Sequence, residues 1–237
     1  MKFGNQAAVA ALVLLLAGCG AGKNFTMPAK GALQLGVTTP QQATAMLGDP
    51  LSKNSSTVAS VETATAPPAP PIFTSVKVPG HYDNMVYGYI DTVGQQLVGQ
   101  FAGVRSQRTL HLEFLDGKLV GYSSASSFDN DSTNFDDGKV GQLQRGITTQ
   151  ADVTNLFGAP AGEVMFPVIS MQKGHAALYS FVQDNITARE RATKFLAVYF
   201  DDGGVVRDFE STDATNPLPV PVSSGTTIVP IVIPRGR

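Results

Sequence analysis

Histidine and serine are the residues of this chain that could carry acid–base or nucleophilic chemistry. The three histidines, His81, His111 and His175, stand far apart, and none belongs to an H-x-H or H-E-x-x-H pattern that would bring two ligands to one metal. The run nearest to a nucleophile elbow, residues 121–125, reads Gly-Tyr-Ser-Ser-Ala and lacks the second glycine that such a strained turn needs. We therefore predict no catalytic residue and no metal site, and we expect His111 to be solvated on the polar face of a strand.

Four aspartates crowd one polar segment and could together hold a weak calcium ion. They are Asp129, Asp131, Asp136 and Asp137. An EF-hand loop beginning at the first of them would need glycine at its sixth position and glutamate at its twelfth, where this chain has asparagine and valine. We prefer a solvated linker, with Asp136 near the start of a helix.

Basic residues precede the penultimate strand expected in each half of the chain. They are Arg105, Arg108, Arg189, Arg191 and Lys194. Two interpretations stay open: hairpin loops kept in solution by charge, or a surface for anionic headgroups or an acidic partner. We predict no binding site from them. A formal net charge of −2, with lysine and arginine unclustered, argues against a nucleic-acid partner.

The single cysteine, Cys19, ends an apolar amino-terminal segment. Lys2 supplies positive charge and residues 7–16 are apolar, a run too short to span a bilayer but suited to a signal peptide. The Leu-Ala-Gly-Cys ending resembles the bacterial lipobox, in which the chain is cut before a cysteine that receives a diacylglyceryl thioether and an N-acyl chain. We predict that residues 1–18 are a lipoprotein signal peptide and that Cys19 is the lipidation site. The alternative is an ordinary secretory signal with an incidental cysteine.

Lipidation determines the expected location of the protein. Three acyl chains anchor firmly, because each buried CH₂ contributes about 0.8 kcal/mol. Gly20 follows the cysteine, in place of the aspartate that marks inner-membrane retention in many Gram-negative lipoproteins. We expect the protein to be lipid-anchored at the periplasmic face of the outer membrane.

A motif that occurs twice, at a spacing of 110 residues, organises the rest of the chain. Residues 36–50 read GVTTPQQATAMLGDP and residues 146–160 read GITTQADVTNLFGAP. In each copy the second threonine, Thr39 or Thr149, suits a helix N-cap, and an apolar stripe at i, i+3, i+4 follows it. Glycine and proline then end the helix. Two such helices in register predict a duplicated domain.

Hydrophobic patterns of period two follow each predicted helix. Strands are expected at residues 85–90, 109–114, 118–124, 164–170, 176–182, 194–200 and 204–210. Asp-Gly pairs at 116–117 and 202–203 are typical of two-residue hairpin turns. The register would place Leu196, Val198, Phe200, Val205 and Phe209 on the face that packs against the helix. The predicted fold class is α+β, with each half made of one or two short helices on its own three- to four-stranded antiparallel meander.

The expected domain boundaries follow from these elements. They are a tether at 19–30, a first repeat at 31–124 with a proline-rich insertion at 51–80, a linker at 125–137, a second repeat at 138–212 and a Pro/Val-rich tail at 213–237. Proline excludes a helix from the insertion. The tail suits an extended edge strand or an arm that docks on a partner, or it lies on its own domain or stays disordered.

The lipobox, the two G-x-T-T…G-x-P helices and the meanders together resemble the SmpA/OmlA (BamE-like) outer-membrane lipoproteins. The small domain of that family has two helices followed by three antiparallel strands, and a tandem of the unit is similar in layout to secreted β-lactamase inhibitor protein. The resemblance covers residues 33–124 and 143–210, while the insertion and the tail lie outside the family pattern. It implies an envelope lipoprotein that works by protein contact, although fold alone does not fix function.

We therefore expect a non-catalytic, protein-binding scaffold in cell-envelope or outer-membrane assembly or maintenance. The expected partners are outer-membrane or periplasmic proteins, with no cofactor, nucleic acid or small-molecule substrate. The alternative is a protein-binding inhibitor of a single enzyme through the sheet surface, which predicts exposed aromatic side chains on the open face of the sheet. A third hypothesis, an enzyme of unrecognised type, requires a pocket that holds two polar side chains of strongly perturbed pKa.

Overall fold

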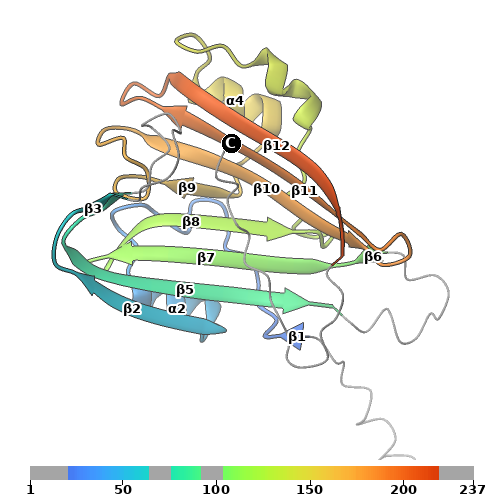
Figure 1. Cartoon of the computed structure of the whole chain (residues 1–237), viewed down its shortest axis with the longest axis horizontal. Coiled ribbons are helices and arrows are strands. Elements are labelled where there is room, and N and C mark those ends of the chain that lie inside the picture. Colours follow the sequence, from blue (N-terminus) through green and yellow to red (C-terminus); the bar gives the residue numbers. More distant parts are fainter. Residues whose placement is uncertain (1–20, 64–75, 92–103, 219–237) are drawn as a thin grey trace, which may run out of the picture.

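The computed structural model describes residues 21–63, 76–91 and 104–218, and its main feature is one antiparallel sheet (Figure 1). Its strands follow the order β1-β5-β7-β8-β9-β10-β11-β12, with β2 added to β5 and β6 added to β10. A separate ribbon pairs β3 (Glu62–Thr63) with β4 (Val76–Lys77). The strands of the sheet are β1 (Ala21–Gly22), β2 (Ser52–Val58), β5 (Gly80–Ile90), β6 (Val104–Arg105), β7 (Gln107–Leu115), β8 (Lys118–Ser126), β9 (Gly162–Val164), β10 (His175–Asn185), β11 (Glu190–Phe200) and β12 (Val206–Pro217).

The predicted fold of two repeats, each on its own meander, is wrong, because strands from both halves of the chain form one continuous sheet. The joint is β9, in which Glu163 pairs with Tyr122 of β8 on one side and with Ala177 of β10 on the other. Local sequence patterns do not reveal this joint, since β9 has only three residues and the strand that it pairs with from the first half, β8, is distant in sequence.

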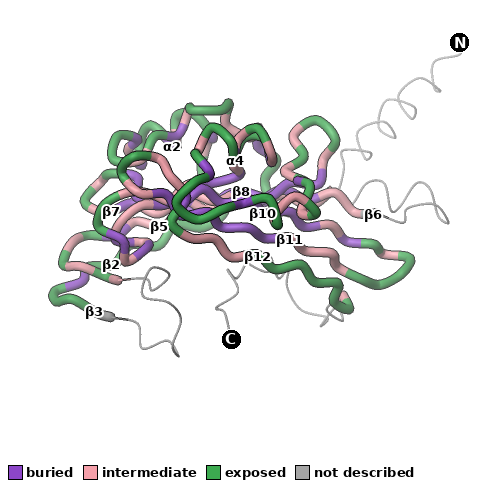
Figure 2. The backbone as a smooth tube through the Cα atoms, turned by 90° about the horizontal axis from the view of Figure 1, so that it is seen from above, coloured by how far each residue is buried: buried purple, intermediate pink, exposed green. Residues whose placement is uncertain are grey.

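Helices α2 (Pro40–Leu47) and α4 (Gln150–Phe157) cover the same face of the sheet (Figure 2). We call this the helix face, and two apolar clusters fill the space beneath the helices. The α2 core contains Phe25, Leu33, Ala43, Leu47, Met85, Tyr87, Leu110, Leu112, Phe114 and Leu119. The α4 core contains Phe135, Leu143, Val153, Phe157, Ala177, Tyr179, Leu196, Val198, Phe200 and Val206. Because side chains alternate along a strand, a third cluster that includes Leu178, Phe195 and Tyr199 lies on the opposite face.

Both helices begin and end where the motif predicts. The hydroxyls of Thr39 and Thr149 accept from the backbone N–H of Gln42 and Asp152, whose side chains accept in return from the threonine N–H groups. These are complete capping boxes. The i, i+3, i+4 stripe predicted for the first helix consists of Ala43, Met46 and Leu47. Ala43 and Leu47 are buried but Met46 is 45% exposed, so α2 buries a narrower stripe than expected.

The glycine that ends each helix is held by a tyrosine of the sheet. Gly48 and Gly158 have φ of 77° and 83° with extended ψ, a region that is essentially open only to glycine. The hydroxyls of Tyr87 and Tyr179 donate to the carbonyls of Gly48 and Gly158, each at 3.1 Å. Each turn is therefore fixed to the strand beneath it.

The segment before each helix is also bonded to the sheet. The Gly36 N–H donates to the Leu119 carbonyl (2.7 Å), and the Leu119 N–H donates to the Thr38 carbonyl (2.9 Å). The second motif makes the same two bonds with Val206, at 2.7 and 2.8 Å. These bonds, with the tyrosine bonds at the other end, fix each helix across its strands.

Two details of the predicted strands are wrong for local reasons. The strand expected at 164–170 stops at Val164, and residues 165–174 leave the sheet, with a cis peptide bond at Phe166–Pro167. The pairing of β11 with β12 shifts between Tyr199 and Phe200, which adds a residue to β12. Val206 therefore occupies the buried position that was expected for Val205.

Segments expected to connect or tether contribute to the packed body. Phe25, from the expected tether, and Phe135, from the expected linker, are both buried, one in the α2 core and one in the α4 core. The insertion supplies β2, which pairs with β5 along its length. Of the tail, residues 213–217 extend β12, and residues 219–237 lie outside the described part of the chain.

Candidate functional site

A pocket of about 560 Å³ opens on the helix face, between the amino-terminal segment and the carboxyl end of α4. Small-molecule and side-chain sites in proteins commonly have this size. The pocket is lined by Met27, Pro28, Ala29, Lys30, Gly31, Leu33, Leu110, Tyr122, Ser124, Asp131, Ser132, Thr133, Asn134, Phe157, Gly158, Ala159, Pro160, Ala161, Glu163 and Tyr179. Its position beside β9 places it where strands of the two halves meet.

The floor of the pocket holds one carboxylate between two phenols. Glu163 lies on β9 directly opposite Tyr122 of β8, and Tyr179 lies close by on β10. Burial raises the pKa of Tyr179 to about 12, with a further contribution from the Glu163 charge. Burial, together with the charge and hydrogen bond of Glu163, likewise raises the pKa of Tyr122.

These two pKa shifts bear on the enzyme hypothesis, which requires two perturbed polar groups in one pocket. Both shifts are upward, so the two hydroxyls stay protonated at neutral pH. A general acid or base works best with a pKa near the working pH. Tyr122 and Tyr179 are therefore suited to donate fixed hydrogen bonds rather than to transfer protons.

Hydrogen bonds around the carboxyl end of β8 fix the base of the pocket. Ser124 donates to the Ala161 carbonyl through both its N–H (2.9 Å) and its hydroxyl (2.6 Å). The Ala161 N–H donates to the Leu178 carbonyl at 2.8 Å, and the Thr133 hydroxyl donates to the Ser180 carbonyl at 2.6 Å. These bonds fix the residues between β8 and β10 at the point where the short β9 begins.

The wall formed by the amino-terminal segment is held by a buried arginine. Arg108 is 7% exposed, donates to the Phe25 carbonyl at 2.7 Å and forms an ion pair with Asp131 at 3.0 Å. Its guanidinium lies over the Phe128 ring, 4.2 Å from the centroid. The Asp131 carboxylate that lines the pocket is therefore already neutralised.

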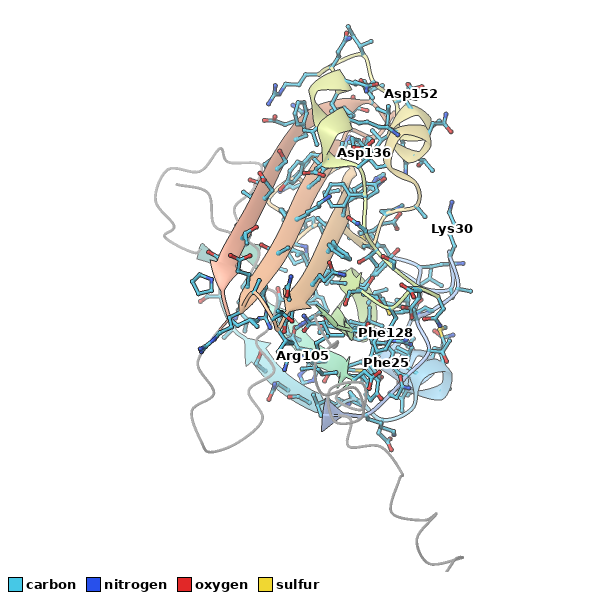
Figure 3. The ribbon with its side chains drawn as sticks, turned by 90° about the vertical axis from the view of Figure 1, so that its right-hand side faces the viewer. Phe25, Lys30, Arg105, Phe128, Asp136 and Asp152 are labelled. Atoms are coloured by element: carbon cyan, nitrogen blue, oxygen red, sulfur yellow. The ribbon has the colours of Figure 1, made fainter. Side chains whose placement is uncertain are left out.

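The remaining charges of the lining are Lys30 and Glu163. Lys30 is exposed at the rim, and in Figure 3 its side chain points away from the sheet. No ion pair to Glu163 occurs within the described ranges of the chain. The pocket therefore carries an unpaired negative charge at its floor, surrounded by aromatic and aliphatic side chains.

The predicted lipidation residue, Cys19, lies outside the described residues, but the chain enters the sheet almost at once after it. β1 pairs Ala21 with Ile90 and Gly22 with Tyr89 of β5. No helix in the described ranges is long and apolar enough to cross a membrane.

Three of the four aspartates considered for calcium have separate partners. Asp131 pairs with Arg108, Asp136 accepts from the Gly138 N–H at 3.2 Å, and Asp137 pairs with Lys194 at 2.6 Å. No group of three or more possible metal ligands occurs among residues 21–63, 76–91 and 104–218.

Most of the basic residues before the penultimate strands are used inside the body. Arg105 and Arg191 both pair with Asp184, a carboxylate with no exposed surface. Arg108 and Lys194 pair with the loop aspartates described above. These four side chains therefore do not form a free surface for anionic headgroups.

The expectation for His111 is also corrected. His111 is half-buried on the face opposite the helices, and burial lowers its pKa. Its Nε2, like Thr109 Oγ1 on the same strand, is buried without a hydrogen-bond partner in the described part of the chain. Strand alternation correctly gives the face of His111 but not what covers that face.

Tyr122, Glu163 and Tyr179 were not predicted as site residues from the sequence. Each lies in or beside a pattern that indicates only a strand, and the three meet because β9 joins the halves. The available local signal was a charged residue, Glu163, directly after the second Gly-x-Pro turn, inside a segment otherwise apolar.

Comparison of the chain with known protein families, with curated proteins and with solved structures found no match.

Proposed function

We propose that this chain is a lipid-anchored, non-catalytic protein-binding scaffold at the periplasmic face of the outer membrane, with a role in envelope assembly or maintenance. The lipobox-like sequence at Cys19 supports the anchor. The partners we propose are outer-membrane or periplasmic proteins.

The observation that carries the proposal is the short length of chain between Cys19 and the first strand of the folded body. β1 begins at Ala21 and is bonded to β5, and Phe25 is buried in the α2 core. Two residues of extended chain span at most about 7 Å. A lipid on Cys19 would therefore hold the β1 edge of the sheet at the membrane surface and give the body a defined orientation.

The opposite edge of the sheet offers a surface for a partner. β12 ends the strand order, and residues 211–216 of it are exposed. An edge strand presents backbone N–H and C=O groups to which another chain can add a strand. In this arrangement the binding edge lies at the far side of the sheet from the anchored edge.

The alternative of an enzyme inhibitor that uses the open sheet face receives less support. That hypothesis expects exposed aromatic side chains opposite the helices. The aromatic side chains that the described strands place on that face, Tyr82, Phe195 and Tyr199, are all at most 8% exposed.

The proposal is tested by cross-linking in intact cells. A photo-reactive residue at Thr215, an exposed position of β12, should capture an envelope protein, while the same residue at exposed Asp202 in the hairpin turn serves as the control. Cys19→Ser should abolish incorporation of labelled fatty acid and reduce the capture from Thr215. Capture that is absent, or that is unchanged in Cys19→Ser, would contradict the proposal.

A further inference from the structure

The lining of the pocket on the helix face also indicates which chemical group the pocket would bind, a point that the scaffold proposal leaves open. We propose that it binds a protonated primary amine against Glu163, and that the amine is a lysine side chain of the partner protein. This inference rests on the proposed protein-binding function and names one contact within it.

The floor of the pocket is built for a cation. Glu163 is a carboxylate without an ion-pair partner in the described part of the chain, and two aromatic rings stand beside it. A carboxylate attracts an ammonium, and the faces of aromatic rings add to that attraction. The other lining carboxylate, Asp131, is already paired with Arg108.

The Tyr122 side chain beside Glu163 favours ammonium over guanidinium. An arginine binds a carboxylate most strongly as a planar fork that uses both carboxylate oxygens. Tyr122 lies directly opposite Glu163 across the β8–β9 pair and lines the same pocket. A lysine ammonium needs only a single carboxylate oxygen, so it needs less room beside Tyr122.

The walls and the mouth suit a side chain delivered by a protein. Leu33, Leu110 and Phe157 line the pocket and can cover the four-carbon stem of a lysine. The mouth is formed by small or uncharged residues that are exposed, including Ala29, Ser132, Asn134, Gly158 and Ala159. A partner surface can therefore approach the rim without meeting a bulky side chain, apart from Lys30.

Binding is measured on the full chain in detergent, with ring-labelled tyrosines observed by NMR. The probe is Nα-acetyl-lysine methylamide, and the matched neutral probe is the norleucine analogue, which has the same stem without the amine. The lysine probe should shift the Tyr122 and Tyr179 signals saturably, and it should leave Tyr82 on the opposite face unchanged. Equal binding of both probes would overturn the inference.

Two substitutions of opposite expected sign separate charge from folding. Glu163→Gln should weaken lysine-probe binding at least tenfold, because the amide keeps an acceptor oxygen but loses the negative charge that attracts the ammonium, whereas Glu190→Gln, on an exposed strand end, should not. Lys30→Gln should strengthen binding, by less than about threefold, since its charge is exposed and screened. If Glu163→Gln binds the lysine probe as tightly as the wild type does, and circular dichroism shows an intact fold, the proposal is wrong.

The source of the amine is tested in cells, with a photo-reactive residue at Asn134 on the rim. The wild-type chain should capture a protein at this position, and Glu163→Gln should capture less of it. If the lysine probe binds in vitro but the rim captures no protein, the amine is a free metabolite and the partner assignment is wrong. Capture at β12 that persists in Glu163→Gln would leave the scaffold proposal standing on its own.

Discussion

Asp184 is a carboxylate with no exposed surface, held between the guanidinium groups of Arg105 and Arg191. Burial alone would raise the pKa of this carboxyl. Hydrogen bonds and charges from Arg191 and Arg105 outweigh that effect and hold the pKa below its ordinary value. Because Arg105 comes from β6 and Arg191 from β11, the cluster fastens β6 to the β10–β11 hairpin.

Replacing the central carboxylate should therefore cost stability in a pH-dependent way. Asp184→Asn leaves two arginines facing an uncharged group and should lower the free energy of unfolding by about 3 kcal/mol at neutral pH. A carboxyl with a lowered folded-state pKa stabilises above its unfolded pKa of about 3.9, and this contribution is lost as the pH falls through the folded value.

Urea unfolding followed by circular dichroism between about pH 6 and pH 2 measures both effects. The variant should lose less stability on acidification than the wild type. Asp202→Asn, in an exposed turn, is the control and should follow the wild-type curve. Parallel curves for Asp184→Asn and wild type would mean that the cluster does not retain its charge in the folded state.

At the scale of elements, each helix depends on the turn that ends it. Gly158 has φ of 83°, and a methyl group added there would meet no atom within 4 Å, so any cost of a side chain comes from the backbone alone. Gly141 in the short 3₁₀ helix η3 (Asp137–Gln142) also has open space around it but no positive φ. The two glycines form a matched pair.

Gly158→Ala should lower the free energy of unfolding by about 1–3 kcal/mol, because alanine rarely adopts this conformation. Gly141→Ala should stay within about 0.5 kcal/mol of the wild type. Thermal unfolding of the two variants checks the difference. Equal melting temperatures would show that the turn relaxes at little cost.

Features that depend on neighbouring residues could be predicted from the sequence, whereas features that depend on pairing between distant residues could not. The caps at Thr39 and Thr149 and the Asp116-Gly117 turn, in which both residues have positive φ, depend on neighbours within a few residues, and all were predicted. The joining of halves through β9 and the meeting of Glu163 with Tyr122 depend on long-range pairing, which no local pattern specifies. The register error at Val205 had a third cause, a bulge of one residue in β12.

At the scale of the whole molecule, two apolar cores lie under one continuous sheet. The α2 core and the α4 core correspond position by position, yet backbone hydrogen bonds run across β8, β9 and β10 without a break. Separate domains joined by a linker would unfold independently. A shared sheet favours one cooperative transition.

Leu112→Ala in the α2 core and Leu196→Ala in the α4 core should each lower the stability of the entire molecule, by about 2–5 kcal/mol. For both variants the urea transitions followed by circular dichroism and by tyrosine fluorescence should coincide. The chain has no tryptophan, so tyrosines distributed over both cores report the fluorescence. Two resolved transitions would show that β9 is a weak joint.

The burial of Phe25 has a practical consequence for anyone who prepares this protein without residues 1–19. Its side chain packs against Tyr87 at a ring separation of 5.6 Å, and its carbonyl accepts from Arg108. A chain that begins at residue 31, after the expected tether, would lack the buried Phe25 ring of the α2 core. It would also lack the carbonyl that accepts a hydrogen bond from the buried Arg108 guanidinium. Expression should therefore begin immediately after the cysteine.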